Sequence, residues 1–203
     1  MIHAWIFNRA VKRVLRPALP SHRIRKILDL TEAEYKKLPK SDRKETLGMS
    51  FIIATCQRNI AFYQSTLQSG ISEQDAKLHI ENINWEITQL LGSPMWHLSI
   101  TRGLNSISRI YWIDKVLWGL LFTRPFERVF TSSDADLSFD VVTCPIQAYY
   151  KSQGHPDLCY HAACVQDYRL ADRWHADFTR TQTLASGAKS CDFKFYVSKD
   201  QRV

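Results

Sequence analysis

The chain has 203 residues and a net charge of +7, from 27 Lys and Arg against 20 Asp and Glu. Its apolar and charged fractions, 45% and 23%, are those of an ordinary globular protein and exclude bulk disorder. This length is sufficient for one hydrophobic core. We expect a single α+β domain over residues 1–203, in which a mainly helical part, 1–130, packs on a small antiparallel sheet. The α+β part, 131–203, would add helices and a closing hairpin.

Five cysteines are present, and no apolar segment resembles a secretory signal. The odd count argues against a disulfide framework, so reduced thiols in a cytoplasmic protein are expected. The most apolar stretch, 110–122, contains Asp114 and Lys115 and is too short to cross a bilayer. We therefore predict no transmembrane segment.

Much of the positive charge lies near the N-terminus. The residues are Arg9, Lys12, Arg13, Arg16, Arg23, Arg25 and Lys26. Few aromatic residues are interleaved, so no nucleic-acid partner is expected, and the prediction is a solvated helix face. Weak contact with an anionic membrane surface is the alternative.

Helical patterns fill the first two-thirds of the chain. Thr31 and Glu34 fit a capping box, which predicts a helix start at Thr31. Residues 43–69 show helical periodicity, with Gly70 as the C-cap. The buried face predicted for this helix comprises Ile52, Cys56, Ile60, Tyr63 and Leu67.

The next helix is predicted to start at Ser72 and to end at Gly92, before a break at Ser93-Pro94. Its predicted buried stripe is Ala76, Ile80, Ile83, Ile87 and Leu90. A further helix, 104–122, is apolar on most sides and is expected to be central, closed by Arg124-Pro125.

Strand patterns begin after about residue 129. Residues 131–136 are predicted as a loop and 137–144 as a strand, and Pro145 opens a short helix that ends near Gly154. A helix over 157–174 follows. Residues 177–184 and 190–198 alternate in polarity and are predicted to form an antiparallel hairpin around Ser186-Gly187.

Two constellations in this region carry chemistry. On the predicted helix 157–174, Cys164, Asp167 and His161 share one face, so a thiol lies one turn from a carboxylate. The alternative is a buried cysteine beside a solvated aspartate. At the end of the first strand, Cys144 precedes Pro145, where a helix N-terminus would lower the pKa of the thiol.

The predicted hairpin offers further polar groups. Arg180 can bind a carboxylate or cover the sheet with its stem, and Thr181 and Thr183 can bind a small polar ligand or form an exposed row. No cofactor is expected. If a zinc ion or an iron–sulfur cluster were bound, Cys144, Cys164 and Cys191 would be its ligands; Cys159 and Cys164, five apart on a helix, would point different ways.

Taken in order, these segments resemble the L-2-amino-thiazoline-4-carboxylic acid hydrolase family. The matching runs are Cys144-Pro145, 154–158, 164–167, 180–187 and 191–193, and the resemblance covers about residues 139–195. Cys164, Asp167, Thr183, Gly187, Cys191 and Asp192 stand at positions of the family motif. Cys159 and His161 lie outside the motif.

The resemblance implies hydrolysis of a small cyclic amidine, in which 2-amino-thiazoline-4-carboxylate would open to N-carbamoyl-cysteine. The implied catalytic residues are Cys164 and Asp167, with Cys144 and Cys191 as alternative nucleophiles. Arg180, Thr181, Thr183, Asp192 and His161 would contact the substrate. The competing hypothesis is a non-catalytic sensor that holds a small molecule or a metal in the same cysteine-rich pocket. The sequence leaves the oligomeric state open.

Overall fold

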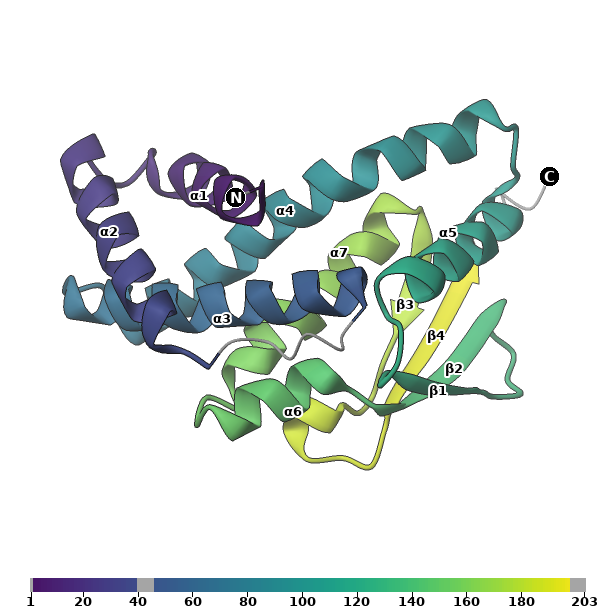
Figure 1. The fold of residues 1–203 in the computed structure, drawn as a ribbon. Coiled ribbons are helices and arrows are strands. Elements are labelled where there is room, and N and C mark those ends of the chain that lie inside the picture. Colours follow the sequence, from purple (N-terminus) through teal and green to yellow (C-terminus); the bar gives the residue numbers. More distant parts are fainter. Residues whose placement is uncertain (1, 40–45, 198–203) are drawn as a thin grey trace.

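The computed structural model describes residues 2–39 and 46–197. Helices dominate the first part of the chain, and a small sheet with two further helices forms the rest (Figure 1). The N-terminal helices are α1 (Ile2–Leu15), α2 (Ser21–Lys37), α3 (Leu47–Gln68), α4 (Glu73–Thr101) and α5 (Ser106–Leu120). The remaining helices are α6 (Pro145–Ser152), the π-helical turn η1 (Tyr160–Cys164), α7 (Val165–Arg173) and the 3-10 turn η2 (Leu184–Ser186). This arrangement confirms the predicted α+β class.

Four antiparallel strands form one sheet in the order β1-β2-β4-β3. They are β1 (Glu127–Phe130), β2 (Leu137–Thr143), β3 (Ala176–Thr179) and β4 (Cys191–Val197). β4 pairs with β2 on one side, with Phe139 opposite Phe193, and with β3 on the other, with Phe178 opposite Phe195. The antiparallel pairing of the closing hairpin is confirmed, but β3 ends at Thr179 and not at residue 184 as predicted. In addition, β1 is a strand that the prediction placed in the helical part.

The start of α4 was predicted correctly, because a polar side chain caps it. The Ser72 hydroxyl accepts a hydrogen bond from the Asp75 N–H at 3.1 Å, and Asp75 in turn accepts from that hydroxyl at 2.7 Å. Gly70 follows α3 with φ +77°, a conformation that favours glycine. Both observations confirm the predicted boundary between α3 and α4.

Two predicted helix boundaries are wrong. Thr31 lies inside α2, where its hydroxyl donates to the Ile27 carbonyl at 2.8 Å instead of capping a helix start. α4 continues through Pro94 for almost two more turns. Proline removes one backbone hydrogen bond, but packing of Met95 and Trp96 against the sheet keeps this segment in the helix.

Two buried faces were predicted with errors at their ends. Most of the stripe residues are buried, but Leu67 and Leu90, the last residue of each predicted stripe, are exposed. α5 is not central: it lies against one face of the sheet, where Ile110 and Ile113 are buried while Tyr111 and Leu120 face solvent (Figure 1).

Two large hydrophobic cores and a smaller cluster of Met49, Ile53 and Phe126 hold the fold together. The helical core contains residues of α1, α2, α3 and α4, together with residues of the C-terminal part that include Tyr150, Leu158 and Cys159. The sheet core lies between β2, β4 and the helices α5 and α7, with Phe139, Phe195 and Trp174 at its centre. The segment η1–α7 contacts both, since Ala162 is buried in the first core and Ala171 in the second.

The basic N-terminal residues lie on exposed faces of α1 and the start of α2, as predicted. Arg13 forms an ion pair with Glu86 of α4 at 3.2 Å, and the Arg9 guanidinium lies over the Trp5 ring. Over the described residues, no helix combines the length and apolar character needed to cross a membrane.

Candidate active site

Residues 160–164 form a turn of π-helix, which the sequence did not predict. The Val165 N–H donates to the carbonyl of Tyr160, five residues back. The wider turn places residues five apart above one another, so Cys159 and Cys164 lie together instead of pointing different ways as predicted. The two thiols lie close enough for the protonation of one to affect the pKa of the other.

Cys164 differs from the other cysteines in the direction of its pKa shift. The neighbouring Cys159 thiol, together with the Arg180 charge, lowers the pKa of Cys164 against the opposing effects of burial and Asp167. Burial raises the pKa of Cys144 to about 12 and that of Cys191 to about 11. The lowered pKa expected for Cys144 is therefore wrong: its backbone hydrogen bonds at the start of α6 do act to lower the pKa, but desolvation outweighs them.

The predicted thiols and carboxylate gather around the start of α7. Cys144 follows β2, Cys164 ends η1 and Cys191 begins β4, and these three thiols lie close enough for their charges to act on one another. The Cys191 sulfur accepts a hydrogen bond from the Leu184 N–H at 3.2 Å. Cys164 is partly exposed, whereas Cys191 is buried.

Asp167 and Arg180 form an ion pair next to Cys164. The Arg180 Nη1 lies 2.5 Å from the Asp167 Oδ2, and its Nη2 donates to the Cys164 carbonyl at 3.0 Å. The Arg180 side chain is only 1% exposed. Burial raises the pKa of Asp167 to about 6, although Arg180 acts to lower it. Because both of these contacts are internal, the structure favours a positioning role for Arg180.

The loop between β3 and β4 uses most of its polar groups internally. The Asp192 carboxylate accepts from the Thr181 N–H at 2.9 Å, the Thr181 hydroxyl at 2.7 Å and the Gln182 N–H at 2.8 Å. Partial burial acts to raise the pKa of Asp192, but these hydrogen bonds together hold it below its usual range. Thr183 accepts from the Ser186 N–H at 3.0 Å and thereby caps η2, and Gly187 closes the turn with φ +88°.

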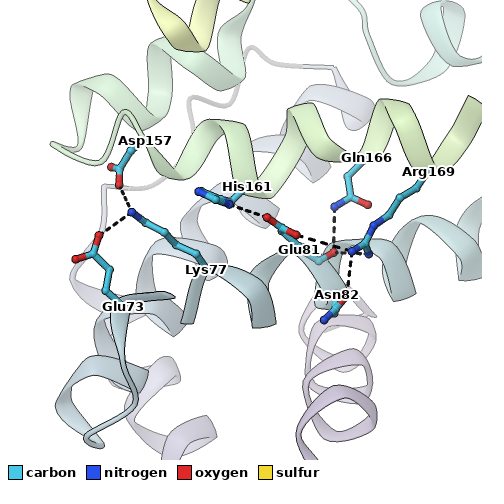
Figure 2. A network of polar contacts seen from close by, with 8 residues as sticks. All are labelled: Glu73, Lys77, Glu81, Asn82, Asp157, His161, Gln166 and Arg169. Atoms are coloured by element: carbon cyan, nitrogen blue, oxygen red, sulfur yellow. Dashed lines mark hydrogen bonds and ion pairs between the residues drawn. The ribbon is translucent and has the colours of Figure 1, made fainter. Parts of the chain in front are cut away.

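His161 points away from this group of residues. Its Nδ1 lies 2.7 Å from the Glu81 carboxylate on α4, and Figure 2 shows the two side chains facing each other. The predicted shared face with Asp167 is wrong even for an unbroken α-helix, since a spacing of six residues leaves the two side chains about 120° apart. The π turn changes the angular position of His161, which joins Gln166 and Arg169 on the side that faces α4.

These side chains belong to a polar network that fixes η1 and α7 on α4 (Figure 2). The Gln166 amide donates to the Glu81 carbonyl at 3.0 Å, and Arg169 donates to the Asn82 side chain at 3.1 Å. One turn before Glu81, the Lys77 ammonium lies 2.6 Å from the Asp157 carboxylate. The i, i+4 spacing of Lys77 and Glu81 was the available sequence signal, but it does not identify their partners.

Within ranges 2–39 and 46–197, no three His, Cys, Asp or Glu side chains are grouped to hold a metal ion. The thiols of Cys144, Cys164 and Cys191 thus interact electrostatically without forming a chelating set. Two surface hollows of the molecule also lie elsewhere: one is between α4 and α7, and the other is between α1 and α4.

Comparison with known families agrees with the segment that the sequence singled out. Residues 118–195 match the model of the L-2-amino-thiazoline-4-carboxylic acid hydrolase family. The match begins near the end of α5 and runs through the sheet, α6, η1 and α7, so it contains Cys144, Cys164, Asp167 and Cys191. The predicted family is therefore confirmed for this segment. No curated protein matches the chain.

Proposed function

Starting from this family match, we propose that the protein is a hydrolase that opens a small cyclic amidine of the 2-amino-thiazoline-4-carboxylate type, with Cys164 as nucleophile. The observation that carries the proposal is the position of Cys164, which is partly exposed and lies next to the Asp167–Arg180 pair inside the matched segment. The lowered pKa of this thiol agrees with that role. A thiolate is the reactive form of cysteine, and the pKa values of Cys56, Cys144, Cys159 and Cys191 are all raised.

The reaction proceeds in two displacements. The Cys164 thiolate bonds to C2 of the ring, and the bond from C2 to the ring sulfur breaks, leaving the substrate as a thiolate and C2 attached to the enzyme. Water then adds to C2, a proton leaves, and the bond to Cys164 breaks. N-carbamoyl-cysteine and the free thiolate of Cys164 result.

Asp167 is the proton carrier in this scheme. A carboxyl group with a pKa of about 6 exchanges protons near neutral pH, which suits a general acid or base. Asp167 lies one turn after Cys164 on the same helix, and Arg180 holds both by pairing with its carboxylate and with the Cys164 carbonyl. Arg180 acts as a positioning residue, and binding a substrate carboxylate would require it to leave Asp167.

The test is turnover of 2-amino-thiazoline-4-carboxylate by purified protein, followed as release of a free thiol. Cys164→Ser should abolish turnover and keep the wild-type circular dichroism spectrum. Cys56→Ala, which changes a buried cysteine in the helical core, is the matched control and should retain activity. Mass spectrometry of wild type quenched during turnover should show the substrate carbon on the peptide that contains Cys164.

Two results would count against the proposal in different ways. Full activity of Cys164→Ser would remove this thiol from the mechanism. Complete inactivity of folded wild type toward this compound and its ring-substituted analogues would remove the substrate class and leave the binding-protein hypothesis.

A further inference from the structure

A hollow of about 600 Å³ lies between α4 and the C-terminal end of α7. We refer to it as the α4–α7 hollow. Its lining consists of Trp85, Trp96, His97, Arg169, Asp172, Arg173 and His175. This volume is typical of small-molecule sites in proteins. Neither the cysteines nor the Asp167–Arg180 pair contributes to its lining, so it is separate from the candidate active site.

Two tryptophans form the wall on α4. Trp85 and Trp96 are eleven residues apart, which puts them on the same stripe of the helix and about 16 Å apart along its axis. Gly92 lies between them on this stripe, and a Cβ at Gly92 would meet no atom within 4 Å. The stripe therefore carries no side chain at position 92, between the two tryptophans.

Basic side chains form the opposite wall. Arg169, Asp172 and Arg173 are three and four residues apart and share one face of α7. Arg169 is already held by Asn82 and lies near Glu81, with its guanidinium 5.9 Å from the Trp85 ring centre. Arg173 is exposed and has no ion-pair partner among the residues that the structure describes.

Aromatic and imidazole rings meet at the end of the hollow near β3. The rings of Trp96 and His175 lie with centroids 6.0 Å apart, and His175 has the left-handed backbone angle φ +55°. This conformation is uncommon for a residue other than glycine, and here it accompanies a ring that faces the hollow. The Arg109 guanidinium also lies over the Trp96 ring, 4.9 Å from the ring centre.

We infer that the α4–α7 hollow binds a planar aromatic molecule that carries an anionic group such as a carboxylate or phosphate. The ring would pack against the tryptophans, because aromatic side chains supply large apolar area with defined geometry. The anion would pair with Arg173, whose guanidinium offers two parallel donors. Arg173 supplies the free positive charge for this anion, because Arg169 is already paired with Glu81.

Indole-3-acetate and its neutral amide, indole-3-acetamide, make a matched pair of probes, with binding measured by isothermal titration calorimetry on the full chain at low salt. We expect the acetate to bind more tightly than the amide. Arg173→Met should weaken binding of the acetate by about 10-fold or more, because a hydrogen bond to a charged group contributes about 1.5–3 kcal/mol. It should affect the amide little. Trp96→Leu should weaken both.

The matched control is Arg16→Met, which removes an exposed arginine far from the hollow in sequence and should leave binding unchanged. Cys164→Ser should also bind the acetate normally, which separates this site from the hydrolase proposal. The inference is overturned if indole-3-acetate shows no saturable binding, if acid and amide bind equally, or if Arg173→Met binds the acid as wild type does. Circular dichroism checks that each variant is folded.

Discussion

The ion pair between Asp167 and Arg180 offers the most direct test of the site's electrostatics. Arg180→Met keeps an apolar stem next to Phe178 and Phe193 but removes the guanidinium that pairs with Asp167 and donates to the Cys164 carbonyl. Removing one partner of a buried ion pair costs about 3–5 kcal/mol. Because the Asp167 side chain is 27% exposed, the lower end, about 3 kcal/mol at pH 8, is expected.

The loss should depend on pH, with a definite sign. Burial raises the pKa of Asp167 to about 6 while Arg180 acts to lower it, so the variant should have a still higher pKa. The folded variant then takes up a proton at a pH where the unfolded chain is still ionised, and its stability increases as the pH falls through that pKa. The difference in stability from wild type should therefore be smaller at pH 5 than at pH 8.

Urea unfolding followed by circular dichroism at both pH values measures this difference. Adding Asp167→Asn to Arg180→Met removes the unpaired carboxylate, so the double variant should be more stable at pH 8 than Arg180→Met alone. Equal losses at pH 5 and pH 8, or a double variant less stable than the single one, would refute the assignment of the cost to an uncompensated carboxylate.

Three further predictions concern other parts of the molecule. Iodoacetamide should label Cys164 before the other cysteines, and Cys159→Ser should change the rate at which Cys164 is labelled. Peptide mass spectrometry measures both, and simultaneous labelling of all thiols would contradict the lowered pKa of Cys164. Asp192→Ala should cost about 1–2 kcal/mol and speed amide exchange in the β3–β4 loop, as for the loss of a cap. Gly48→Ala should destabilise the protein strongly, because the new Cβ would lie 2.0 Å from a backbone oxygen of α5. Gly119→Ala is the control, since its Cβ would meet nothing within 4 Å, and similar melting temperatures for the two variants would contradict the prediction.

Local signals explain the parts of the fold that the sequence predicted. Ser72 caps α4 through a contact three residues away, and Pro145 opens α6 because its ring suits a first helical turn. The alternation of Phe193, Phe195 and Val197 places them on the helix-covered face of the sheet. Each of these features depends on residues close together in sequence, so no knowledge of tertiary contacts was needed.

The errors arose where distant contacts decide the outcome. Packing of Trp96 on the sheet carries α4 through Pro94, although the local pattern predicts a break. Tertiary packing buries the Arg180 side chain and raises the pKa of Cys144, and an isolated sequence motif does not specify this packing. Family resemblance identified the segment that carries Cys164, but the partners of that thiol became visible only in the structure.

The π turn connects these observations, because it sets which side of the helix each residue occupies. A regular helix from 157 to 174 would separate Cys159 from Cys164 and leave His161 about 120° from Asp167. With the wider turn, His161 meets Glu81 and the two thiols meet each other. Beyond the turn, α7 directs Asp167 toward Arg180 and Arg169 toward α4. One short helix thus separates Cys164, the proposed nucleophile, from the α4–α7 hollow, and for this reason substitutions at Cys164 and Arg173 should act independently.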